Sequence, residues 1–315
     1  MTKRIAYFCI ESLGDYWLKP DKPIESCFFL KHEMTDEQYY QILNSTNQIE
    51  TYIIQHINLN PPGLYKLMTD SEIEFIQQKV FDEFNFKVVK QLIISIKSSW
   101  VKNHIIKRHH IFKKHLNKMI IKYIDKTDDI LKLCEKYDFS PMTILRAIFE
   151  KIYKMKFSNL ITVNKTKFII TDYDMRQLDL ALKSDNFNQL DQTNIHVMAE
   201  NFESEIEKIL IKHNIKHQTQ LQLTEIQKSN YGKAINTPDF LILDDLIIND
   251  HKIKWIDAKN FYGANIPFIK SKITKQIKKY ISEYGSGCII FSLGFNELLN
   301  FPNVLLLDVN DISKI

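Results

Sequence analysis

The spacing of the apolar residues changes once along the chain. From residue 35 to about residue 214 they recur at intervals of three and four, which is the period of an amphipathic helix. After residue 217 short stretches alternate between apolar and polar residues, which is typical of strands. Only 7 glycines and 8 prolines occur among 315 residues, so regular elements should fill most of the chain. We therefore expect an all-α N-terminal part followed by an α/β C-terminal part.

Composition places the chain among ordinary globular proteins, because 44% of its residues are apolar and 25% are charged. No apolar run is long enough to span a membrane, and we expect no membrane partner. The run Ile5–Ile10 is too short for a secretory signal, because Glu11 follows at once. The cysteines form no Cys-x-x-Cys pair and are expected to be reduced thiols in an intracellular protein. They are Cys9, Cys27, Cys134 and Cys288.

Breaks in the pattern divide the chain into four expected segments. Pro20 and Pro23 interrupt an irregular start, and the polar run from Ser184 to Asn194 marks the boundary before the second domain. The expected segments are an irregular stretch at 1–34, a basic helical domain at 35–156, a connector at 157–196 with one short helix starting at Thr171, and an α/β domain at 197–315.

Two capping boxes predict helix starts in the N-terminal part. In Thr35-x-x-Gln38 and Thr69-x-x-Glu72 the threonine and the later side chain can satisfy backbone N–H groups of a first helical turn. Pro61-Pro62-Gly63 should separate these two helices, and residues 70–125 should be mostly helical.

The segment 97–122 is strongly cationic and contains no acidic residue. Its apolar residues recur near helical spacing, so we expect one or two amphipathic helices with a cationic face. Like charges at helical spacing repel each other, which favours binding of a polyanion through its phosphates over a merely solvated face. A helix on a membrane surface is the main alternative. The cations are Lys97, Lys102, His104, Lys107, Arg108, His109, His110, Lys113, Lys114, His115, Lys118 and Lys122, of which Lys102, Lys107, Arg108, Lys113 and Lys114 are candidate nucleic-acid contacts.

Residues 127–154 predict two helices separated by a three-residue turn. Thr127 can cap a helix that begins at Asp128, and Ser140 followed by Pro141 is a favoured start for the second helix. A pair of this size resembles a helix-turn-helix, with an ordinary helical hairpin as the alternative. The residues expected to face outward from the second helix are Met142, Thr143 and Arg146, of which Arg146 would contact nucleic acid.

The C-terminal part predicts the order helix, three strands, helix, strand, strand. The second helix is rich in lysine, and the strand after it is an apolar run that suits a buried position. The expected helices are at 197–214 and 269–284, and the expected strands are at 218–223, 237–243, 252–258, 287–293 and 304–309.

Two carboxylates and a lysine fall on neighbouring strands of this part. Residues i and i+2 of a strand point to one face, so Asp257 and Lys259 share a face while Ala258 points into the opposite layer. Asp239, near the start of the neighbouring strand, can lie alongside Asp257. A hard divalent cation relieves the repulsion between two carboxylates, and a lysine beside them can orient water or stabilise charge on a phosphate. These groups suit metal-assisted phosphodiester hydrolysis, whereas each motif alone is also common in turns and on exposed strands.

This arrangement resembles the PD-(D/E)xK nuclease superfamily, which has a restriction-endonuclease-like α-β-β-β-α-β core. In the resemblance Asp239 and Asp257 stand for the two motif acids, and Lys259 stands for the motif lysine. Glu203, in a Phe-Glu-x-x-hydrophobic pattern, takes the place of the first-helix acid, with Glu200 as the second choice.

A further motif of exonuclease-like members, Gln-hydrophobic-x-x-Tyr, matches Gln276-Ile277-Lys278-Lys279-Tyr280. The resemblance implies one or two Mg²⁺ or Mn²⁺ ions and gives Gln276 the role of orienting the lysine or a phosphate. The implied metal ligands are Glu203, Asp239, Asp257 and the carbonyl of Ala258. The expected contacts to nucleic acid in this part are Lys270, Lys272, Lys275 and Tyr280.

The residues around the acids match a narrower family. Thr237-Pro238-Asp239-Phe240 and the stretch from Trp255 to Gly263 resemble the TPD-motif family, which includes codanin-interacting nucleases of animals and archaeal proteins similar to Holliday junction resolvases. Members carry helix-turn-helix regions before the nuclease core, so the resemblance covers most of residues 36–315. It implies a protein partner, a homodimer and a nuclear location, with the cytoplasm as the alternative.

The sequence and the resemblance thus predict a Mg²⁺- or Mn²⁺-dependent nuclease that hydrolyses phosphodiester bonds of DNA, with branched and single-stranded DNA as candidate substrates and the substrate structure left open. The patterns do not distinguish an endonuclease from an exonuclease, or DNA from RNA. Two other classes stay open: an inactive DNA-binding or scaffold protein with a nuclease-like core, and a transcription regulator that binds a specific sequence through the helix at 141–154.

Overall fold

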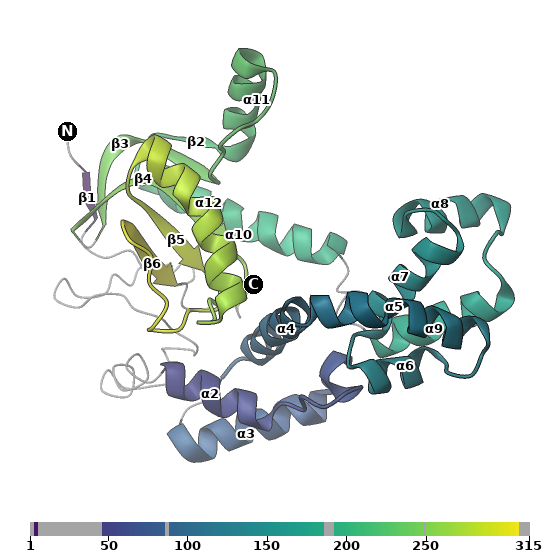
Figure 1. Cartoon of the computed structure of the whole chain (residues 1–315). Helices are drawn as coiled ribbons and strands as arrows, with labels where there is room; N and C mark the ends of the chain where they lie inside the picture. Colours follow the sequence, from purple (N-terminus) through teal and green to yellow (C-terminus); the bar gives the residue numbers. More distant parts are fainter. Residues whose placement is uncertain (1–2, 6–45, 86–87, 186–191, 249, 309–315) are drawn as a thin grey trace. The chain divides into compact units, whose positions relative to one another are not determined.

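A computed structural model of the chain describes residues 3–5, 46–85, 88–185, 192–248 and 250–308 (Figure 1). Contacts divide the chain into two units, and helix α4 (Lys90–Lys107) contributes to both. The sheet unit comprises residues 1–56, 71–99 and 193–315, and the helical unit comprises residues 57–70 and 100–192. Within the described ranges, no helix is long and apolar enough to cross a membrane.

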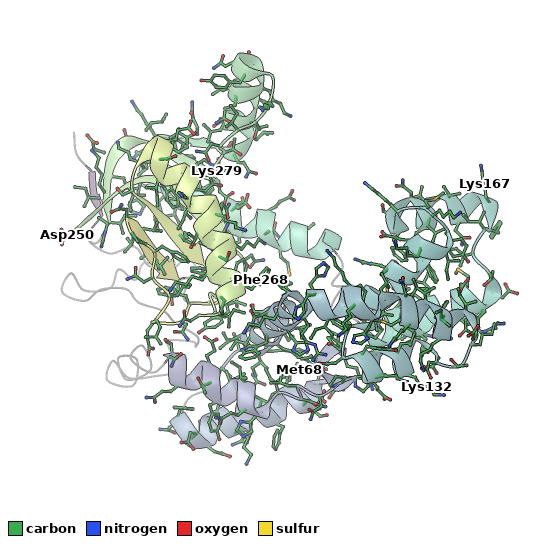
Figure 2. The ribbon with its side chains drawn as sticks, viewed as in Figure 1. Met68, Lys132, Lys167, Asp250, Phe268 and Lys279 are labelled. Carbon is green, nitrogen blue, oxygen red and sulfur yellow. The ribbon has the colours of Figure 1, made fainter. Side chains whose placement is uncertain are left out.

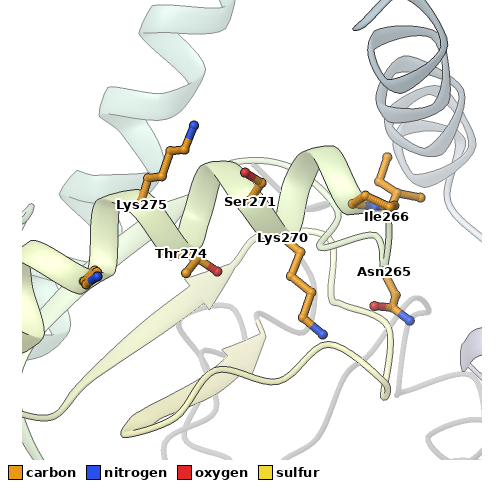
Figure 3. Close-up of a pocket in the computed structure, with 8 residues that line it drawn as sticks. Asn265, Ile266, Lys270, Ser271, Thr274 and Lys275 are labelled. Atoms are coloured by element: carbon orange, nitrogen blue, oxygen red, sulfur yellow. The ribbon is translucent and has the colours of Figure 1, made fainter. Parts of the chain in front are cut away.

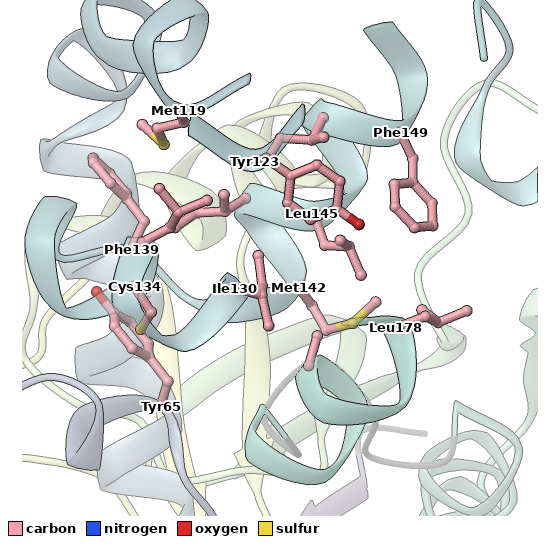
Figure 4. Packing of buried hydrophobic residues seen from close by; sticks show 14 of the residues in the cluster. Tyr65, Met119, Tyr123, Ile130, Cys134, Phe139, Met142, Leu145, Phe149 and Leu178 are labelled. Atoms are coloured by element: carbon pink, nitrogen blue, oxygen red, sulfur yellow. The ribbon is translucent and has the colours of Figure 1, made fainter. Parts of the chain in front are cut away.

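Helices of the helical unit pack around one apolar core (Figure 4). Aromatic side chains from different parts of this unit meet there: the ring centres of Tyr123 and Phe149 lie 6.4 Å apart, and those of Phe112 and Phe139 lie 5.0 Å apart. The elements are η2 (Gly63–Tyr65), the C-terminal half of α4, α5 (His109–Ile124), α6 (Ile130–Tyr137), α7 (Pro141–Ile152), α8 (Phe157–Lys167) and α9 (Asp172–Ser184).

Side-chain caps set several of these helix starts. Ser140 caps α7 and Thr171 caps α9, as the sequence predicts. The prediction that Thr127 caps α6 is wrong, because Asp129 is the N-cap of that helix. The Thr127 hydroxyl instead donates to the carbonyl of Lys122 at the end of α5.

Residues 157–185 are part of the helical unit rather than the connector that we expected. Leu160 of α8 and Leu178 of α9 are buried in the core. Asp185, directly after α9, accepts a hydrogen bond of 2.9 Å from the backbone N–H of Met142. These helices expose many polar residues and bury a narrow apolar stripe, which is why their composition suggested a linker.

Helix α7 is embedded in this core. Met142 is only 1% exposed, so the expectation that it faces outward is wrong. Thr143 is half-buried, whereas Arg146 is exposed and its guanidinium lies 5.4 Å from the centre of the Phe157 ring. The helix is surrounded because α5, α6, α8 and α9 all contact it.

The sheet unit is a mixed sheet with helices on both faces (Figure 1). The strand order is β1-β3-β4-β5-β6, with β2 also paired to β3. Pairing is antiparallel between β2 and β3 and between β3 and β4, and parallel between β4, β5 and β6. The elements are β1 (Lys3–Ile5), α2 (Thr46–His56), α3 (Asp70–Phe84), the first half of α4, α10 (Gln192–Lys212), β2 (His217–Thr219), α11 (Gln220–Tyr231), β3 (Phe240–Ile248), β4 (His251–Lys259), α12 (Pro267–Tyr284), β5 (Gly287–Phe291) and β6 (Val304–Asp308).

Most C-terminal elements lie where the sequence predicts them, but residues 218–223 do not form the expected strand. Strand β2 ends at Thr219, and α11 begins at Gln220. Thr219 and Gln222 form a capping box that starts this helix. The order α10, β2, β3, β4, α12, β5 contains the expected α-β-β-β-α-β order, with α11 inserted after β2.

The N-terminal expectations have a mixed outcome. Residues 3–5, which we expected to be irregular, form β1 and pair in parallel with the end of β3. The rest of 1–34 and the capping box at Thr35 lie outside the described residues. Helix α3 begins at Asp70, directly after Thr69, and residues 61–63 separate it from α2, as predicted.

Different helices cover the two faces of the sheet. Phe202 and Ile206 of α10 pack against side chains on one face of the sheet, such as Phe240 of β3 and Ile256 of β4. On the other face, Tyr280 of α12 packs on the indole of Trp255, with ring centres 5.2 Å apart. Residues that alternate along β3 and β4 therefore face different helices.

The last turn of α12 depends on a close approach to Trp255. The indole N–H of Trp255 donates to the carbonyl of Gly285 at 2.8 Å. A Cβ atom on Gly287 would lie 2.1 Å from the ring of Trp255, which is fully buried. Strand β5 can therefore begin here only with glycine.

We expect Gly287→Ala to lower the free energy of unfolding by about 1–3 kcal/mol, because the added methyl group overpacks a buried indole. Urea denaturation measures this change. In a Trp255→Leu background the same substitution should cost less, since the ring that it would overlap has been removed. Equal costs in both backgrounds would contradict this account.

Candidate active site

Asp257 and Lys259 lie two residues apart on β4, and their side chains form an ion pair. Asp257 is fully buried, and the Lys259 side chain is 14% exposed. Ala258, between them, packs on the opposite side against the cluster that contains Phe202. The two charged groups thus share the face covered by α12, and Ala258 faces α10, as the strand pattern predicts.

Asp239 joins these groups because β3 begins beside them. The antiparallel register pairs Phe240 with Ile256, and Asp239 comes immediately before Phe240. One Asp239 carboxylate oxygen accepts a hydrogen bond of 2.7 Å from the backbone N–H of Ala258. The carboxylate thus takes the place that a further residue of the strand would occupy.

The carbonyl of Ala258 belongs to the same edge of β4. In a paired strand, the N–H and C=O of one residue project from one edge. The carbonyl of Lys259 points to the β5 side, where it accepts a hydrogen bond from Ser292. The carbonyl of Ala258 therefore points to the β3 side, where Asp239 lies.

Electrostatic effects in this cluster oppose full ionisation. Burial, and after it the charge of Asp257, raises the pKa of Asp239 to about 8. Burial raises the pKa of Asp257 as well, while Lys259 acts against that shift. Without a bound cation, Asp239 therefore holds a proton at neutral pH.

Helix α12 contributes Gln276, whose side-chain amide donates to Asp257 at 3.1 Å and to the hydroxyl of Tyr280 at 3.0 Å. Tyr280 in turn donates to the carbonyl of Thr237 at 3.3 Å. Tyr280 is 6% exposed, so it is not on the nucleic-acid interface where we expected it. The motif spacing of four residues places both side chains on the helix stripe that faces the sheet.

Glu203 lies on α10 and is half-buried. Its charge is among the causes that raise the pKa of Asp239. Glu200, the second choice for the first-helix acid, is exposed. These observations favour Glu203 as the acid that acts on the cluster.

The cluster offers hard oxygen donors. In the described part of the chain, no group of three or more His, Cys, Asp and Glu side chains is arranged to hold a metal ion. The paired carboxylates, with the carbonyl of Ala258 on the same edge, nevertheless fit Mg²⁺ or Mn²⁺, since both ions prefer oxygen ligands and would favour the ionised form of Asp239 that burial and the charge of Asp257 oppose. Glu203 would complete such a set.

Next to this cluster, the exposed side of α12 is basic. A groove with a volume of about 640 Å³ runs along the first turns of the helix (Figure 3). Lys279, further along the helix, is exposed as well (Figure 2). Lys272 is also exposed. The residues that line the groove are Asn265, Ile266, Pro267, Lys270, Ser271, Thr274, Lys275 and Lys278.

The expected cationic segment forms two helices, but an acid from another segment neutralises part of it. Asp138, at the end of α6, accepts hydrogen bonds from Arg108 and from His104 at 2.8 Å. The guanidinium of Arg108 also lies 5.4 Å from the centre of the Phe139 ring. Asp138 lies 30 residues beyond Arg108, outside the window in which we found no acid. Arg108 is thus part of the internal structure of the helical unit.

Other cations of this segment are on the surface. Lys102 and Lys107 of α4 are exposed, and so are Lys113 and Lys114 of α5. Lys97 is buried at 7% exposure, and burial lowers its pKa, so it is not on the cationic face that we expected.

Sequence reasoning missed the side chains that hold the loop after Lys259. The hydroxyl of Tyr262 donates to Glu50 of α2 at 3.0 Å, and its backbone N–H donates to Ser95 of α4 at 2.9 Å. Asn296, after β5, donates to Glu50 at 2.6 Å. No local signal could reveal these contacts, since 212 residues separate Glu50 from Tyr262.

Taken together, the chain contains an α/β unit with a buried carboxylate–lysine cluster at the end of two adjacent strands. Residues 171–310 match the family model described as "Protein of unknown function TPD sequence-motif". The predicted likeness to the TPD-motif family is therefore confirmed over these residues.

Two relatives are similar to parts of the chain. Over 82 residues, 25% of the chain, it is 38% identical to "Uncharacterized protein L539" of Acanthamoeba polyphaga mimivirus, of which it covers 30%. Over 183 residues, 56% of the chain, it is 24% identical to "CDAN1-interacting nuclease 1" of Xenopus laevis, of which it covers 58%. The chain thus spans less than two thirds of either relative. No solved structure matches it.

The raised pKa of Asp239 predicts how stability depends on pH without divalent cations. Its folded pKa of about 8 exceeds the unfolded value, so the wild type should lose stability as pH rises toward 8. Asp239→Asn should remove this loss and be more stable above pH 8 by at least about 1.4 kcal/mol, the equivalent of one pKa unit. Thermal melts in EDTA across pH measure the difference.

Asp245→Asn is the matched control for this measurement. Asp245 is an exposed carboxylate of β3 that forms ion pairs with Lys252 and Lys254, which lower its pKa. Its neutralisation should not raise the melting temperature. If Asp239→Asn follows the pH profile of the wild type, the two carboxylates do not interact as described.

Proposed function

We propose that the protein is a divalent-metal-dependent nuclease of the PD-(D/E)xK type that hydrolyses phosphodiester bonds of DNA. The observation that carries this proposal is the convergence of Asp239, Asp257 and Lys259 at the ends of β3 and β4. Burying two acidic side chains beside each other costs stability, and a role in binding a cation would account for that cost. The order of elements in the sheet unit agrees with the proposed superfamily, and one relative is named a nuclease.

Each group of the cluster has a distinct role in this proposal. Asp239, Asp257 and the carbonyl of Ala258, with Glu203, would hold Mg²⁺ or Mn²⁺, which supplies Lewis acidity for the scissile phosphate when bound. Lys259, beside Asp257, positions the attacking water and stabilises negative charge on the phosphate. In the reaction, the water oxygen bonds to phosphorus and loses a proton, while one P–O bond breaks and the leaving oxygen gains a proton.

Gln276 fixes the geometry of these groups. Its amide donates to the buried Asp257 oxygen that does not pair with Lys259. This contact holds the carboxylate plane, so that the other oxygen stays on the side of Lys259.

The basic side of α12 supports a polyanionic substrate. Lys270, Lys272 and Lys275 are exposed on the helix that carries Gln276. Exposed lysines on a helix neutralise phosphates without reading bases. In the helical unit, Lys113 and Lys114 offer a second exposed basic surface for flanking DNA.

The remaining expectations stay predictions. The name of the frog relative states an interaction with another protein, which supports a protein partner for this chain. A homodimer and a nuclear location rest on the resemblance alone, as does the choice of branched or single-stranded DNA.

We expect Asp257→Asn and Lys259→Ala each to reduce cleavage by at least about 100-fold, since each removes a charge from the reacting centre. The assay incubates purified protein with branched DNA, single-stranded DNA and RNA of one sequence, with Mn²⁺, Mg²⁺ or EDTA. Asp245→Asn should cleave as the wild type does, and thermal melts should show that all variants fold.

Undiminished metal-dependent cleavage by both folded variants would refute the assignment. A wild type that binds DNA in a salt-dependent way but cleaves nothing would favour the scaffold function. Strong preference for one sequence, without cleavage, would favour a transcription regulator.

A further inference from the structure

The chain segment that leads into Asp239 is held by Gln227 of α11, which is 7% exposed. The side-chain carbonyl of Gln227 accepts hydrogen bonds from the backbone N–H groups of Ile235 at 2.7 Å and Asn236 at 3.0 Å. Its amide donates to the carbonyl of Asn236 at 2.7 Å. One side chain thus satisfies both the donor and the acceptor of Asn236, as a neighbouring strand would.

Helix α12 holds the same segment from a second direction. The side-chain amide of Asn236, which is 4% exposed, donates to the carbonyl of Lys279 at 3.0 Å and to the carboxylate of Glu283 at 2.6 Å. The hydroxyl of Tyr284 donates to the carbonyl of Asn236 at 2.8 Å. Asn236 is therefore tied to two helices through its backbone and its side chain.

We call the contacts of Gln227, and those of Asn236 with α12, the clamp. Few backbone torsions are free between the clamp and the carboxylate of Asp239. The carbonyl of Thr237 accepts a hydrogen bond from Tyr280, and the ring of Pro238 fixes its own φ angle. Asp239 is the next residue, and its carboxylate is bonded to the N–H of Ala258.

We propose that Gln227 and Asn236 are positioning residues that hold Asp239 against Asp257. Two carboxyl groups from different strands can serve one ion only if their separation is fixed, so the segment that carries Asp239 needs a restraint outside the strand pairing. The inference deepens the proposed nuclease function and rests on it for its catalytic consequence. It also assigns a role to α11, the helix inserted between β2 and β3.

Loss of the clamp should change catalysis more than substrate binding. Gln227→Ala leaves the backbone N–H groups of Ile235 and Asn236 without their partner and removes one of two donors to the Asn236 carbonyl, so Asp239 can move away from Asp257. We expect kcat to fall by about 10- to 100-fold, the effect of a displacement near 1 Å, and the Mn²⁺ concentration for half-maximal activity to rise. KM for DNA should stay within about twofold, because neither residue lies on the basic face of α12.

Hydrogen exchange of the Ala258 amide reports the position of Asp239 without any metal or substrate. In Gln227→Ala this amide should exchange about tenfold faster or more, while the amide of Ile256, paired with Phe240, keeps its protection. NMR measures both rates in one sample. Tyr284→Phe, which keeps the ring and removes one hydroxyl, should show a smaller change of the same kind. Asn230→Ala, which removes an exposed amide from the same helix, is the matched control and should show none.

Unchanged exchange at Ala258 in folded Gln227→Ala overturns the clamp, and Tyr284→Phe decides the question if Gln227→Ala does not fold. Faster exchange with an unchanged kcat overturns the catalytic role. If the wild type cleaves no nucleic acid, the proposed function fails, and the Ala258 exchange rates still decide whether the clamp holds Asp239.

Discussion

The sheet unit is organised around two acidic side chains that lie next to each other in its interior. Asp239 and Asp257 stay side by side because the pairing of β3 with β4 stops where the Ala258 N–H can bind a carboxylate instead of a further strand residue. Lys259 compensates part of the charge, and burial keeps a proton on the pair. Without a cation, burial of the two carboxyl groups lowers the stability of the folded state, and a bound cation would offset that cost by favouring their ionised form.

This electrostatic cost accounts for the number of elements that brace the cluster. Helix α12 reaches Asp257 through Gln276 and the Thr237 carbonyl through Tyr280. Helix α2 reaches the loop after Lys259 through the buried Glu50, whose pKa is raised by burial. Residues far upstream of the strands are thus part of the same unit, and the N-terminal helices are not simply a separate nucleic-acid-binding domain.

Local patterns predicted the placement of the groups in the cluster better than the packing around it. Asp257 and Lys259 could be placed on one face because the period of a strand relates them within three residues. The start of α7 could be predicted for a similar reason, since the Ser140 side chain accepts a hydrogen bond from the backbone N–H of Thr143, only three residues along the chain. A local signal also exists for α11, since Thr219 and Gln222 form a capping box. It overlaps an alternation of apolar and polar residues that instead predicts a strand.

What could not be predicted involves partners that are distant in the sequence. The ion pair between Arg108 and Asp138, the burial of Met142 among neighbouring helices, and the bond between Tyr262 and Glu50 all depend on tertiary packing. Composition likewise cannot distinguish a connector from amphipathic helices that bury only a narrow apolar stripe. Helices α8 and α9 are of this kind, and polar residues occupy most of their length, as they do in a connector.

Calorimetric titration of the metal-free protein with Mn²⁺ at pH 6 and pH 8, in buffers of different ionisation enthalpy, tests the central claim most directly. The account predicts that binding releases a proton at pH 6, that affinity rises as pH approaches the pKa of Asp239 near 8, and that Asp257→Asn abolishes the binding. Binding with no proton release and equal affinity in Asp257→Asn, or no binding at either pH, would contradict it.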